Sequence, residues 1–158
     1  ARFAATMGFD VHTETTRLSK KLLAELDTLP KERIHGEFEK ILLKGKKPSK
    51  AFRWLDEVGA LKHMFPELEA LKHIDQGQKH HPEGSVFEHT MLALDTLPRK
   101  DRTLPIMLGI LTHDMGKATV KAEADGDAVH FFGHAEEGVA TAEKFMRRFT
   151  CVLIFKWL

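Results

Sequence analysis

Apolar residues recur every three or four positions along almost the whole chain, which is the spacing of one face of an α-helix. Strands show apolar residues at every second position, so this pattern leaves little room for sheet. The pattern and its Pro and Gly breaks predict helices over Thr13–Leu26, Pro30–Gly45, Pro48–Gly59, two short pieces of Leu61–Leu71 divided at Pro66, Ser85–Leu97, Pro105–Gly116 and about His134–Phe149.

Two segments depart from the helical pattern. Asp125-Gly126 is a type I′ turn signal between Val120–Ala124 and Asp127–Phe132, which predicts a small β-hairpin. The polar, histidine-rich stretch Asp75–Gly84 is predicted to be a loop. The sequence therefore predicts an all-α fold with one small hairpin. The helix from Pro105 is apolar on every side, so we expect it to be buried.

Length and composition exclude several classes of protein. A chain of 158 residues predicts one domain or at most two small ones, and a net charge of +1 argues against a strongly basic nucleic-acid protein. The longest mostly apolar run, Leu104–Leu111, is far shorter than the ~20 residues that span a bilayer, so no membrane partner is expected. A single cysteine, Cys151, excludes a disulfide framework and predicts a reducing, cytoplasmic setting.

One basic run stands out from this balanced composition. It carries five positive side chains and no acidic residue between them: Lys44, Lys46, Lys47, Lys50 and Arg53. Its functional interpretation is a patch that contacts RNA phosphates. A solvated loop and helix start is the alternative interpretation, and the sequence leaves it open.

The segment His113-Asp114-Met115-Gly116-Lys117 carries the strongest chemical signal. It places an imidazole and a carboxylate side by side at the end of an otherwise apolar helix. Because an unpaired buried charge costs several kcal/mol, a divalent cation bound by both side chains would explain the pair. The ammonium group of Lys117 could hold a phosphate oxygen. The alternative is a plain helix end, capped by Gly116 and with Lys117 favourable to the helix dipole.

Further histidines lie on other predicted elements of this ten-histidine chain. His89 lies one turn into the helix that Ser85 begins, and His134 heads the last helix. Together with His113 and Asp114 they would form a ligand set at the core of a helical bundle. His130 at the hairpin end is a candidate second-metal or substrate residue, and so is His81 in the loop. Each of the four histidines also has a structural interpretation, as a core, helix-start, hairpin-surface or loop residue.

These residues resemble a known family. The pattern His89 … His113-Asp114-x-Gly116-Lys117 … Gly133-His134 resembles the HD superfamily of metal-dependent phosphohydrolases. Further segments resemble the CCA-adding tRNA nucleotidyltransferase and poly(A) polymerase family, in which an HD domain follows a helical neck and body: Arg2-Phe3-Ala4 … Gly8-Phe9, Gly59-Ala60-Leu61 … Phe65-Pro66-Glu67, His81-Pro82-Glu83-Gly84 … His89-Thr90 and His130-Phe131-Phe132-Gly133-His134.

The resemblance implies a helical neck and body over residues 1–74 and a C-terminally truncated HD-type bundle over residues 75–158. It implies hydrolysis of phosphomonoesters or 2′,3′-cyclic phosphates at RNA 3′ ends, with tRNA or a nucleotide phosphoester as substrate. The cofactor would be a divalent ion (Ni, Co, Mn, Mg or Zn), and His113, Asp114 and Lys117 would be the catalytic residues. Asp114 would serve both as ligand and in orienting the attacking water.

The sequence also departs from the family pattern. The family's catalytic head would precede residue 1, and no Asp after Thr150 matches its last metal ligand. The start at Ala1 and the apolar ending over residues 151–158 predict a fragment of a longer protein. Two other functions therefore stay open, namely a tRNA-binding body fragment with a non-catalytic HD scaffold, and a nucleotide-sensing module without turnover.

Overall fold

The computed structural model describes residues 1–77, 81–126 and 128–153, and their side chains except at positions 125 and 149–153. The start of the predicted second strand at Asp127 lies outside the described residues. Residues 154–158 of the predicted apolar ending also lie outside the described residues.

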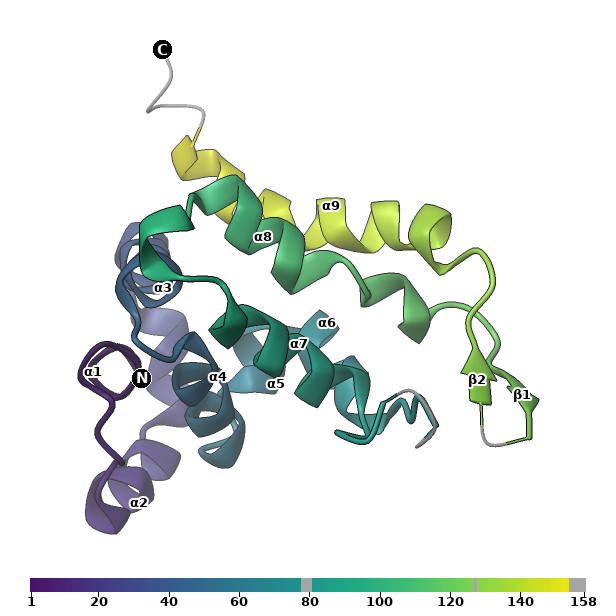
Figure 1. The fold of residues 1–158 in the computed structure, drawn as a ribbon. Coiled ribbons are helices and arrows are strands. Elements are labelled where there is room, and N and C mark those ends of the chain that lie inside the picture. Colours follow the sequence, from purple (N-terminus) through teal and green to yellow (C-terminus); the bar gives the residue numbers. More distant parts are fainter. Residues whose placement is uncertain (78–80, 127, 154–158) are drawn as a thin grey trace.

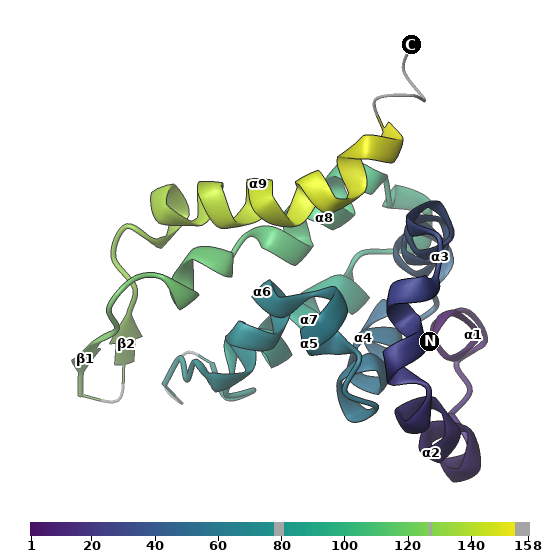
Figure 2. The same cartoon turned by 180° about the vertical axis from the view of Figure 1, so that it is seen from behind.

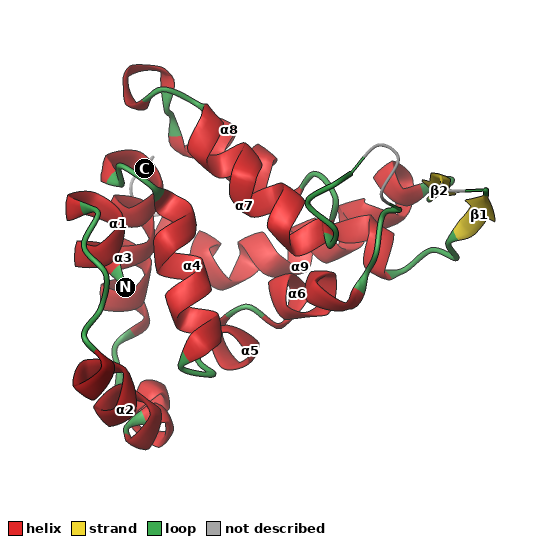
Figure 3. Cartoon of the chain, turned by 60° about the horizontal axis from the view of Figure 1, so that its bottom comes forward, coloured by secondary structure: helices red, strands yellow, loops and turns green. Residues whose placement is uncertain are grey.

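Helices make up most of the described chain, and the prediction of a mostly helical fold with one hairpin is confirmed. Figure 3 shows strand in the hairpin alone, with helices joined by loops in the rest of the described chain. The α-helices are α1 (Arg2–Met7), α2 (Thr13–Lys21), α3 (Lys31–Lys44), α4 (Pro48–Glu57), α5 (Leu61–Met64), α6 (Pro66–Ala70), α7 (Val86–Thr96), α8 (Leu104–Thr112) and α9 (His134–Leu153). Short 3₁₀ segments are η1 (Leu23–Thr28), η2 (Leu71–His73), η3 (Arg99–Asp101) and η4 (Met115–Ala118).

The hairpin consists of β1 (Glu123–Asp125) and β2 (Ala128–His130), which pair antiparallel with Glu123 opposite His130. Gly126 in the connecting turn has a positive φ of 58°, but Asp125 belongs to β1 and pairs with Ala128, so the type I′ turn predicted with Asp125-Gly126 at its centre does not form there. The hairpin projects at one end of the molecule, and α1 and α2 lie at the opposite end (Figures 1 and 2). None of the described helices is both long and apolar enough to cross a bilayer.

A cluster of aromatic rings forms the centre of the core. Phe38 of α3 lies 5.3 Å from Phe65 and 6.0 Å from Phe52 of α4, and Phe65 lies 5.9 Å from Phe145 of α9, measured between ring centroids. The same buried cluster continues into Met91 of α7 and into α8 and η4. One core therefore joins helices from both sides of the predicted boundary at residue 74.

Two expectations about individual helices are wrong, and one helix was not predicted. The predicted helix Thr13–Leu26 leaves α-helical geometry at Lys21 and continues as η1. The unpredicted helix is α1, which at six residues is too short to show a helical repeat. The helix from Pro105 is not buried all round, because it packs on α7 and α3 and no described element covers Ile106, which is 47% exposed.

Polar contacts hold α7 against α4 and so fix the position of His89. The Ser85 hydroxyl caps α7 by accepting a hydrogen bond from the Glu88 backbone N–H. The Glu88 carboxylate forms an ion pair with Arg53 of α4, in which Nη2 of Arg53 lies 2.6 Å from Oε2 of Glu88. Asp95 of α7 accepts bonds from the backbone N–H and the hydroxyl of Ser49, at 3.1 and 2.6 Å, in the first turn of α4.

Candidate metal centre

Three elements bring the four predicted ligands into one neighbourhood, but His134 approaches Asp114 alone and lies outside the group formed by the possible ligand atoms of the other three residues. His89 comes from α7, His113 and Asp114 from the bend between α8 and η4, and His134 from the start of α9. The Nε2 atom of His113 lies 3.2 Å from Oδ2 of Asp114, and Nε2 of His134 lies 3.6 Å from Oδ1. Three of these residues could each offer one ligand atom such that all three atoms lie within 4.8 Å of one another: His89, His113 and Asp114. The carboxylate is thus the centre of the cluster.

Each of the three rings has its Nδ1 atom tied to an acceptor. The Nδ1 of His113 donates to the Ile110 carbonyl at 2.8 Å, and the Nδ1 of His134 donates to the Phe131 carbonyl at 2.7 Å. The Nδ1 of His89 lies 2.6 Å from Oε1 of Glu83. A carbonyl can only accept, so the neutral ring carries its proton on Nδ1 and its lone pair on Nε2. Metal-binding histidines in proteins show this same arrangement.

Asp114 is buried, with 4% of its surface exposed, yet it remains ionised. Burial alone would raise its pKa, but hydrogen bonds from the protonated form of His113 and from Lys117 outweigh burial and hold the pKa well below its ordinary value. The hydrogen bond to Asp114 in turn raises the pKa of His113 against the opposing effect of burial. A proton and a cation would therefore compete for the same side of the His113 ring.

Lys117 lies beneath the carboxylate and is almost fully enclosed, its side chain being 11% exposed. Its ammonium group donates to Oδ2 of Asp114 at 2.9 Å and to Oε1 of Gln76 at 2.6 Å, and it lies 5.6 Å from the Phe131 ring centre. An ammonium group has three N–H donors, so one remains for a phosphate oxygen. Sequence reasoning missed Gln76, because nothing in its loop distinguishes it from its polar neighbours.

The close approach of η4 to α9 places His134 beside Asp114. A Cβ atom on Gly116 would lie 1.8 Å from the His134 carbonyl oxygen and 2.6 Å from the backbone nitrogen of Gly138. Position 116 therefore requires glycine because a Cβ atom does not fit there. A positive φ is not the reason, since Gly116 does not have one. The alternative interpretation of Gly116 as the cap of the preceding helix is wrong, since His113 occupies the C-cap of α8.

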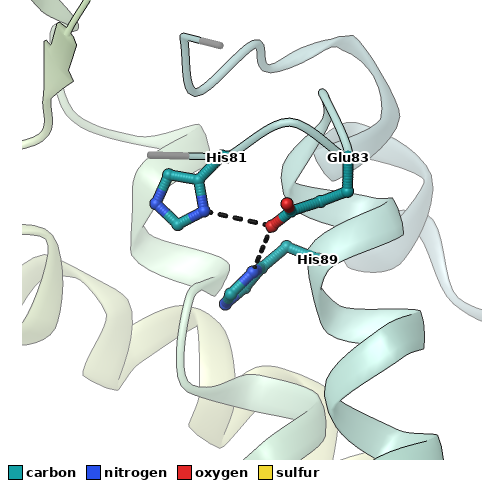
Figure 4. A group of neighbouring side chains, drawn as sticks. All are labelled: His81, Glu83 and His89. Atoms are coloured by element: carbon teal, nitrogen blue, oxygen red, sulfur yellow. Dashed lines mark hydrogen bonds and ion pairs between the residues drawn. The ribbon is translucent and has the colours of Figure 1, made fainter. Parts of the chain in front are cut away.

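A second group of side chains adjoins the first at His89. The Oε1 atom of Glu83 lies 3.1 Å from Nδ1 of His81 and 2.6 Å from Nδ1 of His89, as Figure 4 shows. A hydrogen bond from its own backbone N–H, together with those from His89 and His81, outweighs burial and lowers the pKa of Glu83 to about 2. Glu83 lies in a segment that resembles the family, but the sequence alone indicated no role for it.

His130 is not among the described residues that gather at the two groups of possible ligand atoms. Its ring is exposed on β2 and stacks on Phe132, with centroids 5.6 Å apart and planes 20° apart. Nothing in the hairpin therefore supports His130 as a ligand of the same cation.

The basic run divides into paired and exposed side chains. Lys50 donates to Asp10 at 2.7 Å, and Arg53 pairs with Glu88. Lys44, Lys46 and Lys47 are exposed, and no ion pair joins them to another described residue. The sequence window contains no acid, but the fold supplies acids to Lys50 and Arg53 from distant segments.

Comparison with known proteins agrees with the resemblance to the CCA-adding and poly(A) polymerase family. Residues 8–72 match the family model described as the probable RNA and SrmB-binding site of polymerase A. The chain is 42% identical over 128 residues to the multifunctional CCA protein of Alkalilimnicola ehrlichii, an alignment covering 78% of the chain and 31% of that protein. The corresponding protein of Halorhodospira halophila is 35% identical over 170 residues, covering 99% of the chain and 40% of that protein.

The matched body segment and these relatives define the class of protein to which the chain belongs. The chain belongs to the family of CCA-adding enzymes and poly(A) polymerases. It spans little more than a third of the length of the curated relatives it matches. No solved structure gives a significant match.

Proposed function

We propose that the cluster around Asp114 is a divalent-metal centre that hydrolyses phosphoesters. The observation that carries the proposal is the convergence of three imidazoles on one buried carboxylate, each ring with its Nδ1 held by another acceptor. Imidazole with carboxylate suits Zn, Ni, Co and Mn better than it suits Ca or Mg, which prefer oxygen ligands. The donor set therefore fits a bound divalent cation.

His89, His113, Asp114 and His134 would hold the cation. When bound, a divalent cation supplies Lewis-acid activation of a water molecule and of a phosphoryl oxygen. Lys117 holds Asp114 ionised and offers its third N–H to a phosphate oxygen. Asp114 accepts a hydrogen bond from Lys117 on Oδ2, while its Oδ1 lies 3.6 Å from Nε2 of His134, and we infer that this carboxylate would orient the attacking water.

The proposed substrates are phosphomonoesters and 2′,3′-cyclic phosphates at the 3′ end of tRNA. Membership of the CCA-adding family and the relatives' name support a tRNA end over an unrelated phosphoester. Residues 75–158 would provide this activity as an HD-type bundle, and residues 1–74 would form the neck and body.

Hydrolysis assays with added metal test the proposal. We expect the folded chain to hydrolyse bis-p-nitrophenyl phosphate and 2′,3′-cyclic AMP in the presence of Ni²⁺, Co²⁺ or Mn²⁺, and EDTA to abolish turnover. Absence of turnover with every metal, in protein that binds nucleotide by calorimetry, would instead establish a nucleotide-sensing module.

A second proposed function is RNA binding by the body. Residues 8–72 match a probable RNA-binding segment, and Lys44, Lys46 and Lys47 lie exposed within it. Phosphate contacts by lysine release counterions, so binding that depends on these side chains weakens steeply with salt.

Replacing Lys44, Lys46 and Lys47 together with glutamine is expected to weaken tRNA binding at low salt and to reduce the salt slope. Each lost phosphate contact removes ~0.7–0.9 from the slope of log K against log salt, so three contacts remove roughly two to three. Replacing the exposed Lys100, Lys121 and Lys144 with glutamine removes the same charge elsewhere and serves as control. Equal effects of the two triple variants would contradict a specific RNA surface.

A further inference from the structure

Glu83 presents one carboxylate oxygen to two imidazoles at once. The turn His81–Gly84 is closed by a hydrogen bond from the Gly84 N–H to the His81 carbonyl at 3.0 Å, and this turn brings the side chains of His81 and Glu83 to the same place. Oε1 of Glu83 then lies within hydrogen-bond distance of Nδ1 in both His81 and His89 (Figure 4). The Glu83 side chain is 16% exposed, so water has little access to compete for these bonds.

The short contact with His89 argues that this is a hydrogen bond and that the two groups do not ligate a common cation. Two ligands of one cation at about 2.1 Å lie about 3.0–3.4 Å apart in octahedral or tetrahedral geometry. The Glu83–His89 separation is 2.6 Å, which is the length of a strong charge-assisted hydrogen bond. Glu83 therefore binds the proton on Nδ1 of His89.

This bond decides which nitrogen of His89 is available to a cation. With Nδ1 protonated and held by Glu83, the lone pair of the neutral ring resides on Nε2. The His89 ring lies 5.6 Å from that of His113, which belongs to the Asp114 cluster. In His113 and His134 a backbone carbonyl accepts the hydrogen bond from Nδ1. In His89 the acceptor is the side chain of Glu83.

We propose that Glu83 is a positioning residue that fixes the tautomer and ring orientation of His89 for cation binding. His81 supports it as a second donor to the same oxygen and holds the carboxylate in place. The inference rests on the proposed metal centre and adds to it a residue outside the ligand set. Loss of such outer carboxylates in metalloproteins lowers metal affinity about 10–100-fold.

Calorimetric titration of the full chain with Mn²⁺ and with Ni²⁺ tests the inference. We expect Glu83→Gln to lower cation affinity about 10-fold and Glu83→Ala about 100-fold, because the amide oxygen of glutamine still accepts one hydrogen bond. Glu136→Gln removes the same charge from the exposed first turn of α9, near His134, and should leave affinity unchanged. Urea denaturation of the metal-free variants separates an effect on binding from an effect on folding.

The outcomes distinguish the inference from the proposed function. If the wild-type chain binds neither cation, the metal centre itself is wrong and the inference falls with it. If the wild type binds and both Glu83 variants bind equally well, the positioning role alone is wrong. If the wild type binds two cations and His81→Ala loses one of them, Glu83 is a direct ligand of a second cation, which also overturns the positioning role.

Discussion

Gly116→Ala is expected to lower the free energy of unfolding by about 3 kcal/mol or more. The added methyl group would lie 1.8 Å from the His134 carbonyl oxygen and 2.7 Å from the Cα of Gly138. These are backbone atoms of α9, so no side-chain rotation relieves the overlap, and the first turn of α9 must move away from η4. That movement also separates His134 from Asp114. Urea denaturation followed by circular dichroism measures the loss.

Gly109→Ala provides the matched control. Gly109 is an exposed residue within α8, and a Cβ atom there would meet no other atom within 4 Å. Alanine is preferred over glycine inside a helix, so this variant should gain about 0.5–1 kcal/mol. A Gly116→Ala variant as stable as the wild type would show that η4 and α9 are not in close backbone contact.

Asp114→Asn is expected to lower metal-stimulated phosphoester hydrolysis by more than about 100-fold, since outer-shell changes alone cost 10–100-fold. Asparagine keeps the size of the side chain but removes the charge that Lys117, His113 and His134 all approach. The Lys117 ammonium would then be enclosed with no anionic partner, which costs about 1–3 kcal/mol of stability. Steady-state hydrolysis of bis-p-nitrophenyl phosphate and a parallel thermal melt measure the two effects.

Asp101→Asn is the control for Asp114→Asn, since it makes the same change at an exposed position in η3. It should leave both hydrolysis and the melting temperature close to the wild type. A folded Asp114→Asn protein that retains full metal-stimulated turnover would remove Asp114 from the centre of the site.

The parts of the fold that sequence could predict are those encoded by neighbouring residues. Ser85 caps α7 because its hydroxyl needs only a backbone N–H three residues later. Pro66 separates α5 from α6, and Gly126 forms the hairpin turn, through their own backbone preferences. The approach of His89 and His134 to Asp114 was predictable as a hypothesis only, because it requires three elements to meet.

The remainder depends on contacts between segments far apart in the chain. Gln76 meets Lys117 across 41 residues, and nothing local marks either the contact or the burial of Gln76. Arg53 appears unpaired in the sequence, yet Glu88 of α7 neutralises it. The exposure of Ile106 reflects which helices cover α8, and hydrophobic composition alone does not determine that.

The number of divalent cations retained per chain most directly tests the convergence of His89, His113, Asp114 and His134 on one ion. The chain and its His113→Ala variant would be loaded with Mn²⁺ or Ni²⁺, dialysed, and analysed by inductively coupled plasma mass spectrometry. We predict one cation per wild-type chain and almost none in folded His113→Ala. A wild-type chain that retains no cation, or a His113→Ala chain that retains as much as the wild type, would contradict the proposed centre.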